Sequence, residues 1–437
     1  MQKRTIRIFK FAAIAAVPIT LFAFSTGPPI KRTGAPVDDG GRTCTVCHTT
    51  FALNDGTGGS VAITASPYQP GVRQNITVRV HHPTANRFGF QLTARLTSEE
   101  TKEAGTFAES DAIQVRCDPT GNAPCNGALE FAEHRQAATA AGQPGPRRFT
   151  IEWTPPATDV GPVVFYAAGN AANNSGNNQG DHIYTTKLII PSAAAIARPA
   201  ISENGVQNGA SYVAGFAPGG WLQIKGSNLN LNTRIWQESD FDGNKLPTQL
   251  DGTSVKINGK DALLYYISPA QINALAPAED TVGPVSVVVT TYGSASATFT
   301  AQIQRLAPAF FLFRDTSIAA TRADNTAVGP ATLIPGVTTP ARPGETITLY
   351  GSGFGPTTPA VPNGEISTTP ANLASTATIR IGGVDVTPTF AGLAARSAGV
   401  FTFTVVVPAA AADGDLPVVA TLGGVSSPSG PTIRVQR

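Results

Sequence analysis

The feature that most constrains the fold is an internal repeat in the second half of the chain. The stretch "APGGWLQIKGSNL" (217–229) matches "ARPGETITLYGSGF" (341–354), and residues 254–289 match residues 378–420. The corresponding glycines Gly226 and Gly351 lie 125 residues apart. A period this long indicates a duplicated domain, because the units of a solenoid run from about 20 to 50 residues.

Each copy of the repeat consists of short strand-like stretches separated by turn residues. Asn258-Gly259 in the first copy and Gly382-Gly383 in the second are typical of tight hairpin turns. The 44 glycines and 35 prolines, with only 14% charged residues, favour strands and turns over helices. We therefore predict two immunoglobulin-like β-sandwiches, at residues 201–306 and 341–437.

The segment that connects the two copies, residues 307–340, is unusually apolar for a linker. It contains the run "FFLF" at 310–313. We expect these side chains to pack between the two repeats or to complete the sheet of the first. The alternative is an exposed binding patch.

A third sandwich is predicted ahead of the repeat. Residues 59–191 contain six or seven short apolar or alternating stretches, such as "NITVRV" and "RRFTIEW", separated by turn residues. This pattern is typical of an antiparallel sandwich. Residues 192–200 are small and without period and read as a linker. The predicted fold class is therefore all-β throughout.

The N-terminus has the pattern of a secretory signal peptide. Four basic residues among the first ten precede an apolar run from Phe11 to Phe24, and the small residue Ser25 suits a cleavage site. The run is short for a membrane span, although an uncleaved anchor is the alternative. No later stretch is long and apolar enough to span a bilayer. We therefore expect residues 1–25 to be removed and the mature protein to be secreted.

The segment at 26–58 looks irregular and contains the motif "CTVCH", formed by Cys44, Cys47 and His48. In a c-type haem site the two thiols bond covalently to the haem and the adjacent histidine is the proximal iron ligand. The position of the motif shortly after an export signal favours this interpretation. A Cys44–Cys47 disulfide, a redox-active pair and a structural zinc site are the alternatives.

The residue on the other side of the predicted haem can be narrowed. The only methionine is Met1, which would leave with the signal peptide, so a His/Met cytochrome is excluded. His182 is the first candidate and His134 the second, and an open site is the alternative. His81 and His82 are consecutive, so in a strand they face opposite sides and at most one can meet a haem.

The second pair of cysteines and an asparagine-rich run are two further candidate features. Cys117 and Cys125 flank a turn-rich loop, and in an exported protein we expect them to form a disulfide. The run "GNAANNSGNNQGD" at 169–181 is expected to be a solvated loop, with a calcium site as the alternative.

Two stretches resemble known families. The pieces "YQPGVRQNITVRV", "RFGFQLTA", "EHR", "IEWTPP" and "VVFYAAGNAANN" resemble bacterial Reeler-like, choice-of-anchor V domains. The resemblance implies an extracellular β-sandwich, and such domains frequently carry a CxxCH just before it. Residues 201–437 resemble a Solibacter-type C-terminal region related to TIG/IPT immunoglobulin-like modules, which implies a fold and export but no activity.

The chain contains no nucleophile elbow, phosphate-binding loop or HExxH motif. Its net charge is only +2, and no cluster of basic residues in the sequence suggests binding to nucleic acid. We therefore expect a non-enzymatic, exported protein with one covalent haem c, acting in electron transfer or haem-based sensing at the cell surface with an unknown redox partner. The alternative is a non-haem surface protein that binds carbohydrate or protein. A peroxidase-like enzyme is the third and weakest interpretation.

Overall fold

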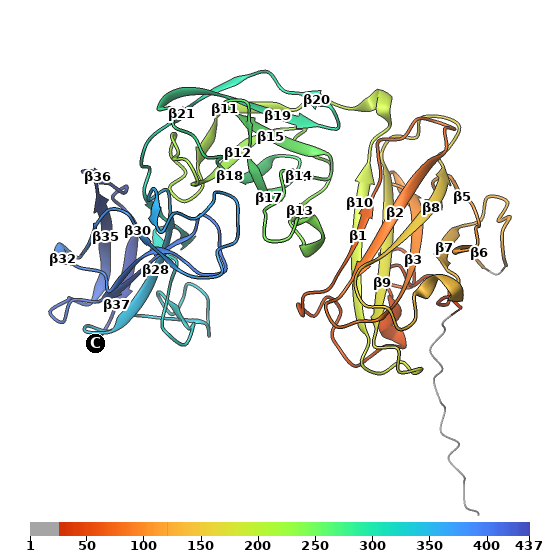
Figure 1. Ribbon diagram of the computed structural model, residues 1–437, viewed down its shortest axis with the longest axis horizontal. Coiled ribbons are helices and arrows are strands. Elements are labelled where there is room, and N and C mark those ends of the chain that lie inside the picture. The colour runs from red at the N-terminus through yellow and green to blue at the C-terminus, as the bar shows by residue number, and fades with distance from the viewer. Residues whose placement is uncertain (1–25, 120) are drawn as a thin grey trace, which may run out of the picture.

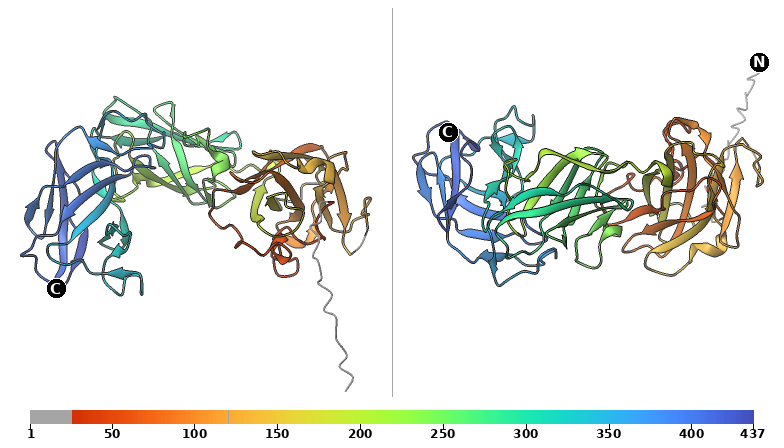
Figure 2. Two further views of the ribbon diagram at one scale, coloured as in Figure 1. Left: turned by 60° about the horizontal axis from the view of Figure 1, so that its bottom comes forward. Right: turned by 90° about the horizontal axis from the view of Figure 1, so that it is seen from above.

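The computed structural model describes residues 26–119 and 121–437, so the predicted signal peptide lies outside the described residues. The chain forms three β-modules in a row, with the N-terminal module at one end and the C-terminal module at the other (Figures 1 and 2). The prediction of an all-β, multi-domain chain is confirmed. Within the described ranges no helix is long and apolar enough to cross a membrane.

The first module is a sandwich of two antiparallel sheets. One sheet has the order β1 (Ser60–Thr64), β2 (Gln74–His81), β8 (Arg147–Thr154), β5 (Thr106–Phe107). The other has the order β10 (His182–Ile190), β9 (Val163–Ala172), β3 (Arg87–Leu96), β7 (Glu130–His134), β6 (Ile113–Cys117), with β4 (Glu99–Glu103) on β3. The fully buried Trp153, Phe149 and Phe165 lie in the core between them.

The two sheets differ in burial because only one has a covered outer face. In β8 buried and exposed residues alternate, as expected for a strand with one face in water. Along β3 nearly every residue is buried. The residues before β1 lie over this second sheet: Ala35 packs with Val164 and Tyr166, and Cys44 packs with residues of β9 and β10. The segment at 26–58, which the sequence predicts to be irregular, therefore packs on the second sheet as a third layer of the module.

A buried ion pair holds this layer in place. Arg95 of β3 is fully buried and its Nη2 lies 2.8 Å from Oδ2 of Asp38. Its Nε donates to Thr93, and its guanidinium lies 5.4 Å from the ring centroid of Phe131. Because removing one partner of a buried pair leaves an uncompensated charge, the docking of residues 26–58 depends on Arg95.

The second module also contains two sheets. The first has the order β11 (Ala200–Asn208), β12 (Trp221–Ser227), β18 (Gln271–Leu275), β17 (Leu263–Ile267), β13 (Arg234–Ile235). The second has the order β14 (Gln249–Leu250), β15 (Thr253–Ile257), β19 (Gly283–Thr291), β20 (Ser294–Ala295), with β16 (Lys260–Asp261) on β15 and β21 (Phe299–Ile303) on β19. Their apolar faces enclose one core.

The third module repeats this plan with additions. One sheet has the order β27 (Thr338–Thr339), β26 (Ala327–Val328), β25 (Ala320–Thr321), β28 (Thr346–Ser352), β34 (Phe401–Val406), β33 (Phe390–Leu393), β30 (Ala371–Leu373), β29 (Thr357–Thr358), with β22 (Ala309–Phe310) on β28. The other has the order β23 (Leu312–Arg314), β24 (Ser317–Ile318), β37 (Thr432–Val435), β35 (Gly414–Leu422), β31 (Ala377–Ile381), β32 (Val384–Val386), with β36 (Val425–Ser426) on β35.

The apolar connecting segment differs from its expectation. It neither fills the space between the repeats nor completes the first of them, because β22 pairs with β28 and β24 pairs with β37, both in the third module. Phe310 is buried in that module's core and packs against Phe354 and Phe403. The apolar run therefore supplies core residues to the second copy of the repeat.

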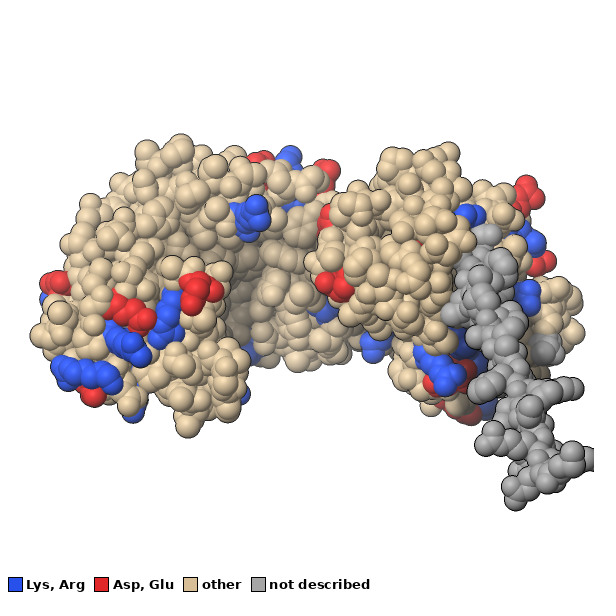
Figure 3. Space-filling view, turned by 90° about the horizontal axis from the view of Figure 1, so that it is seen from below, with Lys and Arg blue, Asp and Glu red and all other residues tan. Residues whose placement is uncertain are grey.

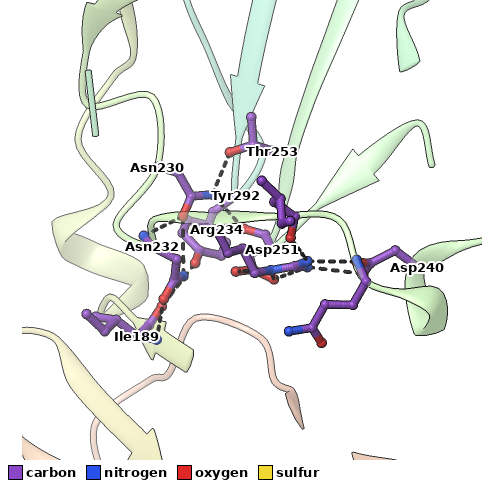
Figure 4. Close-up of polar contacts among 10 residues, drawn as sticks. Ile189, Asn230, Asn232, Arg234, Asp240, Asp251, Thr253 and Tyr292 are labelled. Atoms are coloured by element: carbon purple, nitrogen blue, oxygen red, sulfur yellow. Dashed lines mark hydrogen bonds and ion pairs between the residues drawn. The ribbon is translucent and has the colours of Figure 1, made fainter. Parts of the chain in front are cut away.

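Direct contacts join neighbouring modules. Between the first and second, Asn232 bonds both backbone groups of Ile189, and the Tyr292 hydroxyl donates to the Ile189 carbonyl at 3.2 Å (Figure 4). Between the second and third, Trp221 Nε1 donates to Ala398 O at 3.0 Å, and Leu246 and Leu275 pack with Ala398.

The predicted Cys117–Cys125 disulfide is present, with a Cα–Cα distance of 5.3 Å. It closes the loop that follows β6. Both cysteines fall in one tryptic peptide, Cys117–Arg135. We expect this peptide from secreted, non-reduced protein to be lighter by two hydrogens than after reduction and to resist alkylation. Two alkylatable thiols in that material would contradict the pairing.

Candidate functional site

The CxxCH motif sits on a short turn that the sequence builds locally. Cys44–Val46 form a 3-10 turn (η1), and the Thr43 hydroxyl caps it by accepting from the Thr45 N–H at 3.1 Å. The N–H groups of Cys47 and His48 both donate to Cys44 O. The two thiols are not bonded to each other. Burial raises the pKa of Cys44 to about 12.

The imidazole of His48 is hydrogen-bonded to an aspartate 133 residues later in the chain, Asp181. Its Nδ1 lies 2.8 Å from Oδ2 of Asp181, a carboxylate that is almost fully buried. A carboxylate accepts, so Nδ1 donates and Nε2 carries the lone pair. That lone pair accepts a long hydrogen bond, 3.4 Å, from Nδ2 of Asn170. Metal-binding histidines commonly have such a carboxylate on the other ring nitrogen, because it fixes the tautomer and raises the basicity of the ligand.

His134 is placed by the end of the β3–β7 ladder. Its Nδ1 lies 2.9 Å from Phe90 N and 3.1 Å from Phe90 O. Gly89 makes room for the ring, since a Cβ there would lie 2.5 Å from Cε1 of His134. Burial lowers the pKa of His134 to about 4, so the imidazole is neutral at neutral pH. No hydrogen bond to its Nε2 is found among the described residues.

Both imidazoles line one open pocket. Its volume, including the solvent at its mouth, is about 940 Å³. The wall includes Cys44, Cys47, His48 and His134 together, and Arg32 and Arg87 bring positive charge to it. The structure thus brings His134, the second candidate for the distal ligand, to the CxxCH motif, but not His182, the first candidate.

His182 lies in a different cluster. Its ring stacks between Phe51 and His82, at centroid distances of 3.9 and 4.0 Å. Its Nδ1 lies 2.5 Å from Oδ2 of Asp55. It does not line the pocket, whereas Asp181, the residue just before β10, does and bonds His48.

The consecutive histidines also separate. His82 is buried and takes part in the stack, whereas His81 faces the second module and lies 3.2 Å from Glu238. Neither lines the CxxCH pocket.

Residues 169–172 of the asparagine-rich run belong to β9, and the loop that follows at 173–181 closes one side of the site. Asn178 Nδ2 donates to Cys47 O at 2.5 Å, Gly180 N donates to the Thr50 hydroxyl, and Asn173 N donates to Asp181. Among the described residues there is no group of three or more His, Cys, Asp or Glu side chains arranged to hold a metal ion. Sequence reasoning missed the role of Asp181, although it stands at the end of this polar run.

Glu133 lies beside His134 in the chain, beneath residues 26–29. Its carboxylate accepts from the amides of Gln91 and Gln114, at 2.9 and 2.8 Å, and burial raises its pKa to about 7. The folded module therefore holds a proton that the unfolded chain releases near pH 4.5.

The sign of the resulting pH dependence follows. Ionisation of buried Glu133 weakens the fold as the pH rises from about 4.5 to 7, by about 1.4 kcal/mol for each unit of raised pKa. We expect Glu133→Gln to gain stability relative to wild type over this window, measured by denaturant unfolding from pH 4 to 8. The exposed Glu99→Gln is the control. Parallel curves for Glu133→Gln and wild type would contradict the prediction.

Comparisons with known proteins give distant matches only. No family model matches the chain, and no curated protein does. A human F-spondin reeler domain is 19% identical over 32% of this chain and 95% of that one, with a TM-score of 0.21. The Reelin-N domain of F-spondin is 23% identical over 34% and 97%, with a TM-score of 0.22.

A third match is longer. The Bacteroides ovatus mixed-linkage glucan utilisation locus SGBP-B, in complex with a mixed-linkage heptasaccharide, is 11% identical over 86% of this chain and 70% of that one, with a TM-score of 0.25. Reeler domains and a carbohydrate-bound protein are thus among the solved structures similar to this chain.

Proposed function

We propose that this chain is an exported β-sandwich protein whose first module carries one c-type haem on Cys44 and Cys47. His48 would be the proximal iron ligand and His134 the ligand opposite. When bound, the haem would supply a one-electron redox centre. We propose further that the haem exchanges electrons with a redox partner of unknown identity and that the chain has no catalytic activity. We also propose that the first module belongs to the choice-of-anchor V domains and that the second and third are TIG/IPT-like modules.

One observation carries the proposal: the imidazoles of His48 and His134 line the same pocket as the thiols of Cys44 and Cys47. Asp181 and the Phe90 carbonyl each lie at the Nδ1 of one ring. Asp181 accepts the Nδ1 proton of His48, which leaves its Nε2 as a ligand. Ligation by Nε2 of His134 would require the tautomer in which Nδ1 donates to the Phe90 carbonyl at 3.1 Å instead of accepting from the Phe90 N–H at 2.9 Å. Arg32 and Arg87 would offer their charge to the carboxylates of the haem. The first-ranked candidate His182 is replaced by His134 in this proposal because it does not line the pocket.

The test is the visible spectrum of protein made in a host with the cytochrome c maturation system. We expect a stable haem spectrum that survives denaturation. The matched control is Cys44→Ala with Cys47→Ala, which keeps the fold and His48 but offers no thiol. Colourless wild-type protein, or equal colour in the control, would refute covalent haem.

The second candidate function is binding of carbohydrate or protein at the cell surface without haem. It is favoured by a separate pocket between the second and third modules, of about 1,270 Å³ with its mouth, lined by residues that include Arg305, Glu365 and Phe401. The solved structures named above also include a protein in complex with an oligosaccharide. Calorimetry with a mixed-linkage heptasaccharide tests it, and loss of the binding heat in Arg305→Ala is the expected signature.

A further inference from the structure

Two arginines face each other on the outer surface of the first module. Arg79 of β2 and Arg148 of β8 are direct cross-strand partners. Both point away from the core, since Val78 and Val80 point into it. Like charges directly opposite each other destabilise a sheet. The arrangement therefore calls for a compensating negative charge.

No side chain among the described residues supplies that charge directly. Neither guanidinium makes an ion pair or a hydrogen bond within the described ranges, and Nη1 of Arg79 is buried without a partner. Burial and the charge of Arg148 lower the pKa of Arg79, although Glu238 and Asp240 oppose this effect. An unmade hydrogen bond to a buried donor costs about 1 to 3 kcal/mol, and more for a charged group.

The carboxylates across the module junction are already engaged. Arg234 lies between Asp240 and Asp251, with contacts of 2.7 Å to each (Figure 4). Glu238 lies 3.2 Å from His81 Nε2. Arg234 is outnumbered by these carboxylates, so the second module presents a net negative charge, but no carboxylate contacts the guanidinium of Arg79 or Arg148 within the described ranges.

A pocket separates these two sets of residues. It holds about 880 Å³ with its mouth, and its charged lining consists of Arg79, Arg148 and Lys187 on the first module and of Arg234, Asp240 and Asp251 on the second, an excess of cations. Lys187 is exposed and makes no ion pair with any described residue. The cations of the first module therefore converge on space that a ligand can enter.

We propose that a small oxyanion, a phosphate, sulfate or carboxylate group, binds in this pocket and bridges Arg79 and Arg148. The planar fork of arginine matches the geometry of such groups, and charge-assisted hydrogen bonds are the stronger kind. Bound between the two modules, the anion also strengthens their junction. The site is distinct from the CxxCH pocket, since the two pockets share no lining residue.

The test uses inorganic phosphate and sodium sulfate, with sodium chloride keeping the ionic strength constant. For wild type we expect saturable binding heat in calorimetry and a rise in melting temperature. For Arg79→Gln with Arg148→Gln we expect affinity to fall at least about tenfold, which corresponds to about 1.4 kcal/mol. Galacturonate, tested alongside, distinguishes a carboxylate source from a free inorganic anion.

The control variant is Arg314→Gln, which removes one exposed charge from the third module. It should bind phosphate as wild type does. Without anion, the double variant should be at least as stable as wild type, because the repulsion between the arginines is removed; Arg148→Gln alone repeats this measurement with a milder change. No saturable binding in wild type, or equal binding by the double variant, would overturn the proposal.

Discussion

With the proposed haem bound, replacing His134 by alanine is expected to convert the iron from low-spin to high-spin and to let the reduced protein bind carbon monoxide readily. The reason is geometric: His134 shares a pocket with His48 and both thiols. With two imidazole ligands the iron is low-spin, and its potential is lower than with a methionine ligand. Removing one imidazole opens a coordination position.

The matched control is His182→Ala. It removes an imidazole of the same module that does not line the pocket. Its visible and spin-state spectra should stay as in wild type. If instead His182→Ala gave the high-spin iron and His134→Ala left it low-spin, the ligand assigned from the structure would be wrong.

Replacing Arg95 by alanine is expected to destabilise the first module by about 3 to 5 kcal/mol, the usual cost of breaking a buried ion pair. Arg95 and Asp38 are 0% and 3% exposed, so the carboxylate left behind has no water to solvate it. Because Asp38 belongs to the layer that carries the CxxCH motif, we expect that layer to become accessible to protease in the variant.

The loss should depend on pH in a defined direction. Burial raises the pKa of Asp38 above 3.8, and Arg95 opposes this rise. Without Arg95 the folded-state pKa rises further, so the penalty is full at neutral pH and shrinks as the pH falls through that pKa and the carboxyl becomes protonated.

Denaturant unfolding at pH 7 and pH 4 measures this dependence. Arg73→Ala is the control, because the Arg73–Glu152 pair is exposed and such pairs contribute about 0 to 1 kcal/mol. Asp38→Asn added to Arg95→Ala should restore part of the stability. An Arg95→Ala loss no larger than that of Arg73→Ala would show that the ion pair does not hold the layer.

The sequence predicted the strands, the duplicated modules and the CxxCH motif, because alternation, repetition and a short motif can each be read without knowing which strands pair. Alternation in "RRFTIEW" predicts β8, and the repeat predicts two related modules. The prediction did not extend to the covering layer at 26–58. Its docking depends on the buried Arg95–Asp38 pair, whose partners are 57 residues apart.

The distal residue shows the same limit. His182 follows Asp181 in sequence, but only Asp181 bonds His48, whereas His182 bonds Asp55. His134 reaches the pocket because β7 ends at that residue beside Gly89, which depends on the register of β7 with β3. Composition and spacing carry no information on that register, so the ranking of the histidines could not be settled before the fold.

The charged surface gives a similar lesson. In the view of Figure 3 basic and acidic side chains lie side by side at both ends of the molecule, with scattered charges of both signs between them. A net charge of +2 is consistent with this mixture. It does not reveal that Arg79 and Arg148 are in direct register, because their pairing joins strands that are distant in sequence.

The most direct test of the central claim is the mass of one tryptic peptide. Thr43–Arg73 contains Cys44, Cys47 and His48 and no internal cleavage site. From protein exported by a maturation-competent host, we predict this peptide with the added mass of one haem, absorbing visible light, and with neither thiol open to alkylation. Recovery of the peptide only as the unmodified form, alkylated at both cysteines or linked between them, would contradict the account.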